Sequence, residues 1–218
     1  MPHDIRTPVL RNDDLGNGNY LIEFAAPEMA GDMLPAQFFM IGIPGSETLL
    51  RRPYSVCGLP GTFDGRPDDA VQVLIKVYGR GTALLASLAP GATLEVLGPL
   101  GHGFAAPEAH RVPVFVAGGI GSAPFPAWAV QLAGTSAPPV MFYGARGEGD
   151  LPLADWFEEH SERLIVSTED GSRGHRGRVT EPLEGFLRER EPDSLHLYAC
   201  GPDPMLRAVA GLAERYGV

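Results

Sequence analysis

The segment from Val112 to Ala145 contains no charged residue, and it constrains the fold more than any other part of the chain. Its length would allow a helix that spans a membrane. Five prolines and the glycines Gly118, Gly119 and Gly121 interrupt it, which is too often for one continuous helix. A buried strand, a turn, a helix and a second buried strand account for the pattern better. We therefore expect a protein core here and no membrane insertion.

The sequence after residue 106 alternates between apolar strands and amphipathic helices. The expected strands are Val112–Ala117, Val140–Tyr143, Leu164–Val166 and Leu195–Ala199, and the expected helices are Ser122–Leu132, Leu153–Glu159, Val179–Arg190 and Pro204–Arg215. This alternation predicts an α/β domain with a parallel sheet and crossover helices, over residues 107–218.

The sequence before residue 107 has a different rhythm of short β-rich runs separated by turns. The expected strands are Tyr20–Phe24, Gln37–Ile43, Tyr54–Cys57, Val71–Val77 and Thr93–Leu97. Runs at this spacing predict an antiparallel β-barrel over residues 1–106. One short helix, Thr82–Leu88, is expected within it, with Thr82 as its N-cap.

The composition narrows the class of protein. The net charge of −10 argues against nucleic acid or an anionic membrane surface as a partner. The two cysteines, Cys57 and Cys200, form no Cys-x-x-Cys pair, and the six histidines show no zinc-binding spacing, so no metal site is expected. No secretory signal is evident, and a reducing cytoplasmic location fits the cysteine content.

The run Arg52-Pro53-Tyr54-Ser55 carries the first candidate site. On a strand Arg52 and Tyr54 face one side and Ser55 the other. Together they offer a cation for a pyrophosphate, an aromatic face for a flavin ring and a hydrogen bond near its reactive nitrogen. The alternative is an ordinary barrel strand with a half-buried tyrosine and a solvated arginine.

Gly79-Arg80-Gly81-Thr82 is the second candidate, because it precedes the expected short helix. Free backbone amides at a helix start attract anions, and glycine lets a phosphate approach the backbone. Lys76 lies just upstream and could add a cation. The alternative is a hairpin exit with a threonine cap.

Gly118-Gly119-Ile120-Gly121 follows a buried strand and opens a helix, which is the setting of a dinucleotide-binding loop. The third glycine of the usual pattern is replaced by Pro124, which the first turn of a helix tolerates. Cys200-Gly201-Pro202 ends the last expected strand, at the edge where parallel sheets bind ligands. A tight packing turn and a small core cysteine are the respective alternatives.

The order of these motifs resembles the ferredoxin reductase family of flavoproteins, and within it the electron-transfer subunits of NAD-linked (type B) dihydroorotate dehydrogenases. The likeness runs from about Tyr20 to Tyr216 and includes Gly98–Phe104, similar to the family's inter-domain loop. It implies FAD in the barrel and NAD(H) in the second domain. It also implies electron transfer to a partner subunit of pyrimidine biosynthesis.

The resemblance also implies the site residues. Those for FAD are Arg52, Pro53, Tyr54, Ser55, Leu74, Ile75, Lys76, Gly81 and Thr82. Those for NAD(H) are Gly119, Gly121, Ser122, Ala123, Pro124, Tyr143, Arg146, Glu169, Asp170, Cys200, Gly201, Pro202 and Met205. Ser55 and Cys200 are expected nearest the reacting atoms. The acidic pair Glu169 and Asp170 favours NADH over NADPH.

The family passes electrons on through a [2Fe-2S] cluster held by four cysteines in a C-terminal segment. The two cysteines of this chain cannot hold such a cluster, so none is expected in it. This puts the dihydroorotate-oxidising partner in question. A stand-alone NAD(P)H-dependent flavin or acceptor reductase and a nucleotide-binding regulatory module without redox activity therefore stay as alternatives.

Overall fold

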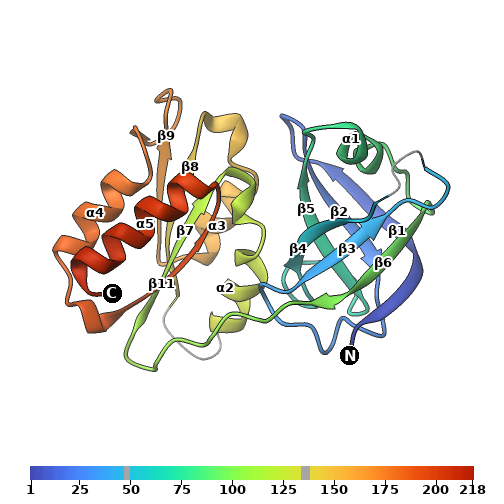
Figure 1. Cartoon of the computed structure of the whole chain (residues 1–218), viewed down its shortest axis with the longest axis horizontal. Helices are drawn as coiled ribbons and strands as arrows, with labels where there is room; N and C mark the ends of the chain where they lie inside the picture. Colours follow the sequence, from blue (N-terminus) through green and yellow to red (C-terminus); the bar gives the residue numbers. More distant parts are fainter. Residues whose placement is uncertain (47–49, 134–137) are drawn as a thin grey trace. The chain divides into compact units, whose positions relative to one another are not determined.

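The computed structural model describes residues 1–46, 50–133 and 138–218, and they form two compact units. One unit comprises Met1–Phe104 with Ala123–Trp128, and the other comprises Ala105–Ser122 with Ala129–Val218. The first contains a β-barrel and the second an α/β sheet (Figure 1). The predicted fold class is therefore confirmed.

The barrel has six strands whose neighbours all pair antiparallel, in the closed order β1-β2-β5-β4-β3-β6. The strands are β1 (His3–Asp14), β2 (Asn19–Ala25), β3 (Phe38–Gly42), β4 (Arg52–Gly58), β5 (Ala70–Lys76) and β6 (Thr93–Leu100). Sequence analysis missed β1, because only Thr7 and Val9 of its twelve residues are buried. A strand so exposed has no apolar pattern to reveal it.

The wall of the barrel is packed on its inner side and held by a polar network outside it. Apolar side chains of the barrel interior, including Phe24, Phe39 and Val73, fill its core. Outside that core, the buried carboxylate of Glu23 accepts a 2.7 Å hydrogen bond from Gln72 and lies 3.4 Å from the guanidinium of Arg66. Arg66 belongs to the β4–β5 connection, so this buried network holds that loop against the barrel wall.

The helix α1 (Arg80–Ala86) begins two residues earlier than expected, and its N-cap is Gly79. Thr82 is not the cap but the third residue of the helix. Its hydroxyl oxygen accepts hydrogen bonds from the amides of Tyr78 (3.0 Å) and Gly79 (3.2 Å). Thr82 thus stabilises the start of the helix from inside, a role that sequence spacing alone could not separate from capping.

The second unit is built on a five-stranded parallel sheet in the order β10-β9-β8-β7-β11. Its strands are β7 (Val112–Gly118), β8 (Val140–Ala145), β9 (Arg163–Thr168), β10 (His175–Arg176) and β11 (Leu195–Cys200). Its helices are α3 (Ala154–His160), α4 (Thr180–Arg188) and α5 (Asp203–Tyr216), with short 3-10 turns at Gly119–Ser122, Glu148–Asp150 and Pro192–Ser194. The helix α2 (Phe125–Ala133) is divided between the units, since its residues up to Trp128 belong to the first.

Neighbouring residues of β8 show how the sheet is covered. Phe142 packs edge-to-face on Phe186 of α4, and Tyr143 packs edge-to-face on Phe157 of α3. Because successive side chains of a strand point to opposite faces, α3 and α4 lie on opposite faces of the sheet. None of the helices in the described part of the chain is long and apolar enough to cross a membrane.

Candidate functional site

The first candidate site brings a cation against the start of a helix. A β-carbon placed on Gly81 would lie 2.5 Å from Cζ of Arg52, so the guanidinium rests directly on the backbone of this glycine. Arg52 also donates a 3.2 Å hydrogen bond to the carbonyl of Leu50. The positive charge and the amides of the first turn of α1 therefore face the same space, a combination that suits a phosphate.

Tyr54 adds a buried polar group to this site. Its hydroxyl is buried and has no hydrogen-bond partner among the residues that the structure describes. Burial raises the pKa of Tyr54, and the nearby charge of Arg52 opposes that shift. A buried hydroxyl without a partner costs about 1–3 kcal/mol, so a ligand atom that accepts a hydrogen bond from Tyr54 would bind favourably here.

The other predicted flavin residues take different positions. Ile75 is 1% and Leu74 3% exposed, so their side chains belong to packed cores and only their backbone could meet a ligand. The ammonium of Lys76 donates to the carbonyl of Asn17 at 2.5 Å, at the β1–β2 turn. Ser55 is half-buried and pairs with Phe38 of β3.

The predicted nucleotide residues gather at one edge of the sheet. Because β7, β8, β9 and β11 are parallel, the segments that follow them meet at the carboxyl edge, where open α/β sheets bind ligands (Figure 1). These segments begin with Gly119, Arg146, Glu169 and Gly201. Sequence analysis named all of these residues, and the topology explains why they come together.

The glycine-rich loop lies tightly against the end of β11. A β-carbon on Gly121 would lie 2.7 Å from the carbonyl carbon of Cys200, and one on Gly201 would lie 3.0 Å from the amide nitrogen of Gly118. Met205 packs against this contact, with Sδ 2.8 Å from a β-carbon placed on Gly118. These glycines are thus required for packing, while Gly118–Ile120 stay partly exposed and could meet a ligand.

The side chain of Tyr143, a predicted nucleotide residue, lies inside the protein. It is fully buried, and its hydroxyl oxygen lies 2.8 Å from Oγ of Ser122, 2.9 Å from the carbonyl of Pro152 and 3.2 Å from that of Gly119. Ser122 is also fully buried. Both side chains support the loop from within, a role that only the tertiary structure reveals.

Ala123 and Pro124 also point inward, since both are buried. The side chains of the second half of the loop are therefore unavailable to a dinucleotide. Contacts from this half would have to come from its backbone.

The segment after β9 presents a fixed negative charge. Oδ1 of Asp170 accepts hydrogen bonds from the amide (2.9 Å) and the hydroxyl (2.6 Å) of Ser172, and these bonds lower the pKa of Asp170. The same hydroxyl accepts a 2.8 Å hydrogen bond from the amide of Glu148. Sequence analysis gave Ser172 no role, although an Asp-x-Ser turn is a recognisable signal. Glu169 and Arg146 are exposed.

The two cysteines belong to different units and are both free thiols. Cys57 is fully buried, and burial raises its pKa strongly. Cys200 is partly exposed at the end of β11, and burial raises its pKa as well. In the described part of the chain, no three His, Cys, Asp or Glu side chains are placed to hold a metal ion.

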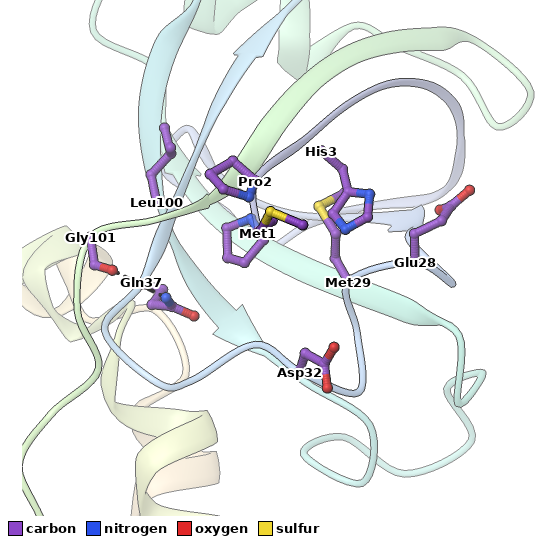
Figure 2. A pocket seen from close by; sticks show the side chains of 10 residues that line it. Met1, Pro2, His3, Glu28, Met29, Asp32, Gln37, Leu100 and Gly101 are labelled. Atoms are coloured by element: carbon purple, nitrogen blue, oxygen red, sulfur yellow. Dashed lines mark hydrogen bonds between the residues drawn. The ribbon is translucent and has the colours of Figure 1, made fainter.

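A separate hollow of about 360 Å³ lies in the barrel unit. Figure 2 shows its walls, where Gln37 donates a 3.1 Å hydrogen bond to the carbonyl of Gly101 and where His3 and Met29 are among the lining residues. None of its lining residues comes from β4, β5 or α1. The hollow therefore does not contain the Arg52 and Tyr54 site.

Two oxidoreductase families match this chain. The FAD-binding domain family matches residues 8–104, and the NAD-binding domain family matches residues 115–211. The chain is 40% identical over 186 residues to the electron transfer subunit of dihydroorotate dehydrogenase B (NAD(+)) from Bacillus caldolyticus, covering 84% of this chain and 67% of the relative. The same subunit from Desulforamulus reducens is 31% identical over 192 residues, covering 88% and 71%.

Solved structures share the architecture. An NADH-dependent reduced ferredoxin-NADP oxidoreductase, described in work on electron bifurcation, superposes with a TM-score of 0.82 at 27% identity, covering 97% of this chain and 73% of the other. The ferredoxin reductase of carbazole 1,9a-dioxygenase superposes with a TM-score of 0.81 at 23% identity, covering 100% and 67%. At that identity the second likeness concerns the fold alone.

These matches agree with the geometry of both units. The chain is an oxidoreductase with an FAD-binding domain and an NAD-binding domain, as the sequence predicted. It spans about two thirds of the length of its relatives. With this fold and this degree of identity, the chain belongs to the ferredoxin reductase-like family of dihydroorotate dehydrogenase B electron transfer subunits.

Proposed function

We propose that this chain passes electrons between NADH and the acceptor of a partner subunit, through FAD bound at Arg52, Tyr54 and Gly81. The observation that carries the proposal is the buried Tyr54 hydroxyl without a partner in the described chain, next to a guanidinium that rests on a glycine at a helix start. No feature of an ordinary barrel strand requires either arrangement.

The residues present suit FAD. The Arg52 guanidinium and the first-turn amides of α1 at Gly81 and Thr82 would hold the pyrophosphate. The Tyr54 hydroxyl would donate to a ligand atom, and Ser55 would lie nearest the reacting nitrogen of the ring. When bound, FAD supplies a centre that accepts two electrons as hydride and releases them singly.

The residues of the second unit suit a dinucleotide. The partly exposed backbone of Gly118–Ile120 lies at the carboxyl edge of the sheet, where a pyrophosphate would bind. Asp170, held ionised by Ser172, would repel a 2′-phosphate and accept a hydrogen bond from a ribose hydroxyl. This supports NADH as the nucleotide, with Cys200 beside the nicotinamide.

The names of the relatives suggest the partner. We propose that the chain serves a dihydroorotate-oxidising subunit in pyrimidine biosynthesis, in the cytoplasm, with domains over residues 1–106 and 107–218. A stand-alone reductase is the second candidate. The solved structure at 27% identity is described as an NADH-dependent reduced ferredoxin-NADP oxidoreductase, so this architecture also serves an acceptor other than dihydroorotate dehydrogenase.

The test measures electron transfer from NADH to a soluble dye, with and without a purified dihydroorotate dehydrogenase catalytic subunit. Formation of a complex, and orotate-dependent oxidation of NADH that needs both proteins, would support the subunit role. Fast dye reduction that the second protein neither binds nor changes would favour the stand-alone reductase. A purified chain without visible flavin absorption would contradict both.

A further inference from the structure

The proposed function gives no role to the buried hydroxyl of Tyr143. This residue is 0% exposed, in the middle of β8, and it packs edge-to-face on Phe157 with ring centroids 5.8 Å apart. A phenylalanine would fill this apolar position equally well. The hydroxyl group therefore has a purpose apart from packing.

The hydroxyl connects two loops at the carboxyl edge of the sheet. Its oxygen lies 3.2 Å from the carbonyl of Gly119 and 2.8 Å from Oγ of Ser122, both in the glycine-rich loop, and 2.9 Å from the carbonyl of Pro152, after β8. A phenol has one proton to donate. That proton goes to one of these three oxygens at a time, so the hydroxyl links the glycine-rich loop to Pro152 without satisfying every neighbour at once.

One of the two loops has a backbone conformation that needs support. Leu153, which follows Pro152, has φ +63°, whereas the φ of +53° at Gly119 is one that glycine adopts without strain. Leucine rarely adopts this left-handed conformation, which persists only where surrounding contacts impose it. The Tyr143 hydroxyl lies within hydrogen-bond distance of the carbonyl of Pro152, directly before Leu153, and of the carbonyl of Gly119 in the glycine-rich loop.

We propose that Tyr143 is a positioning residue for the dinucleotide: its hydroxyl fixes the backbone of Gly118–Ile120 in the conformation that binds the pyrophosphate of NADH. This inference rests on the proposed function, in which that backbone is the nucleotide site. Tyr143 itself touches no ligand and acts through Gly119 and Ser122. Loss of its hydroxyl should weaken NADH binding more than it slows hydride transfer.

The test compares Tyr143→Phe with Tyr198→Phe. The hydroxyl of Tyr198 donates a 2.6 Å bond to the carbonyl of Ala105 in the same unit, and Tyr198 is 5% exposed, so the control loses a buried tyrosine hydroxyl away from the glycine loop. Anaerobic stopped-flow reduction of bound FAD over a range of NADH concentrations gives both Kd and the limiting rate. The FAD content of each variant is measured alongside.

The expected result is a Kd for NADH raised about tenfold in Tyr143→Phe, as loss of well-made buried hydrogen bonds would cause. FAD content and the limiting rate should stay within about twofold, and Tyr198→Phe should bind NADH within about twofold of the unaltered protein. A Kd for Tyr143→Phe within that range overturns the inference. An equal rise in both variants also overturns it, because general loosening of the unit would explain both.

If Tyr143→Phe fails to fold, Ser122→Ala decides the question. It removes the shorter of the two contacts between Tyr143 and the loop while keeping the tyrosine, so a raised Kd supports the inference and an unchanged Kd overturns it. If NADH does not reduce the flavin of the unaltered protein, the proposed function falls and this inference with it. If NADH reduces it normally and Tyr143→Phe binds NADH tightly, only the role of Tyr143 is wrong.

Discussion

Arg52 and Tyr54 support the flavin assignment through two different kinds of contact. Arg52 supplies a charge that rests on Gly81, and Tyr54 supplies a buried hydroxyl with no partner in the described chain. Sequence alternation placed both on one face of a strand. It could not show that one hydroxyl would be left unsatisfied, because that depends on every neighbour of the side chain.

Replacing Arg52 by alanine should weaken FAD binding. The loss should amount to about 1.5–3 kcal/mol, the value of a hydrogen bond to a charged group. Titration of apoprotein with FAD, followed by flavin fluorescence, measures it. Arg6→Ala is the matched control, since Arg6 is 72% exposed on another barrel strand and pairs with Glu95. Equal FAD affinity in both variants would remove Arg52 from the site.

Replacing Tyr54 by phenylalanine should have opposite effects on the two forms of the protein. In the apoprotein the change removes an unsatisfied buried hydroxyl, so stability against unfolding should rise or stay the same. With FAD bound, the same change should remove a hydrogen bond worth about 1 kcal/mol. Thermal unfolding with and without FAD measures both. If Tyr54→Phe destabilised the apoprotein as much as Tyr198→Phe does, the hydroxyl of Tyr54 would already have a partner.

Cys200 should react slowly with iodoacetamide, and NAD⁺ should slow it further. Burial raises the pKa of this thiol, so it is protonated at neutral pH and its alkylation rate should keep rising above pH 9. Cys57 is fully buried and should not react in the folded protein. Mass spectrometry of the alkylated protein measures each site. Alkylation of Cys200 that is insensitive to NAD⁺ would place the thiol away from the nicotinamide.

The glycine-rich loop is tightly packed and yet partly exposed. The approach of Gly118, Gly121 and Gly201 joins the ends of β7 and β11, and it leaves the first part of the loop partly exposed. The two readings that the sequence left open, a tight packing turn and a dinucleotide loop, are therefore compatible. The close contacts made by these glycines account for the tight packing turn.

Gly121→Ala should destabilise the second unit and weaken NADH binding. Its new β-carbon would lie 2.7 Å from the carbonyl carbon of Cys200 and 2.8 Å from Cα of Gly201, and backbone atoms cannot give way cheaply. We expect a loss of about 1–3 kcal/mol of unfolding free energy. Gly211→Ala is the control, because its β-carbon meets nothing within 4 Å in α5. There alanine should stabilise the helix by about 0.5–1 kcal/mol.

Denaturant unfolding measures both glycine variants, and reduction of bound flavin measures their NADH binding. If Gly121→Ala kept the stability and NADH affinity of the unaltered protein, the loop would not be packed as the structure describes.

Sequence reasoning recovered the elements with a clear apolar period and failed where tertiary contacts decide. The buried parallel strands were recognised because their apolar residues form continuous runs. Strand β1 was missed because its neighbours, and not its own composition, make it a strand. The motifs that named Thr82 and Tyr143 did not reveal that their hydroxyls bond to the protein's own backbone.

The two units of the molecule have separate duties. The barrel unit supplies the cation, the helix start and the unsatisfied hydroxyl of a flavin site, and the sheet unit supplies the edge where a dinucleotide binds. The net charge of −10 fits neither a nucleic acid nor an anionic membrane as the partner.

The most direct test of this account is anaerobic titration of the purified protein with NADH, followed by its visible absorption spectrum. We expect a flavin spectrum before NADH is added, and complete bleaching of the flavin absorption with one equivalent of NADH per flavin. NADPH should bleach it more slowly, because Asp170 repels the 2′-phosphate. A protein that carries flavin but keeps its spectrum in excess NADH would contradict the central claim.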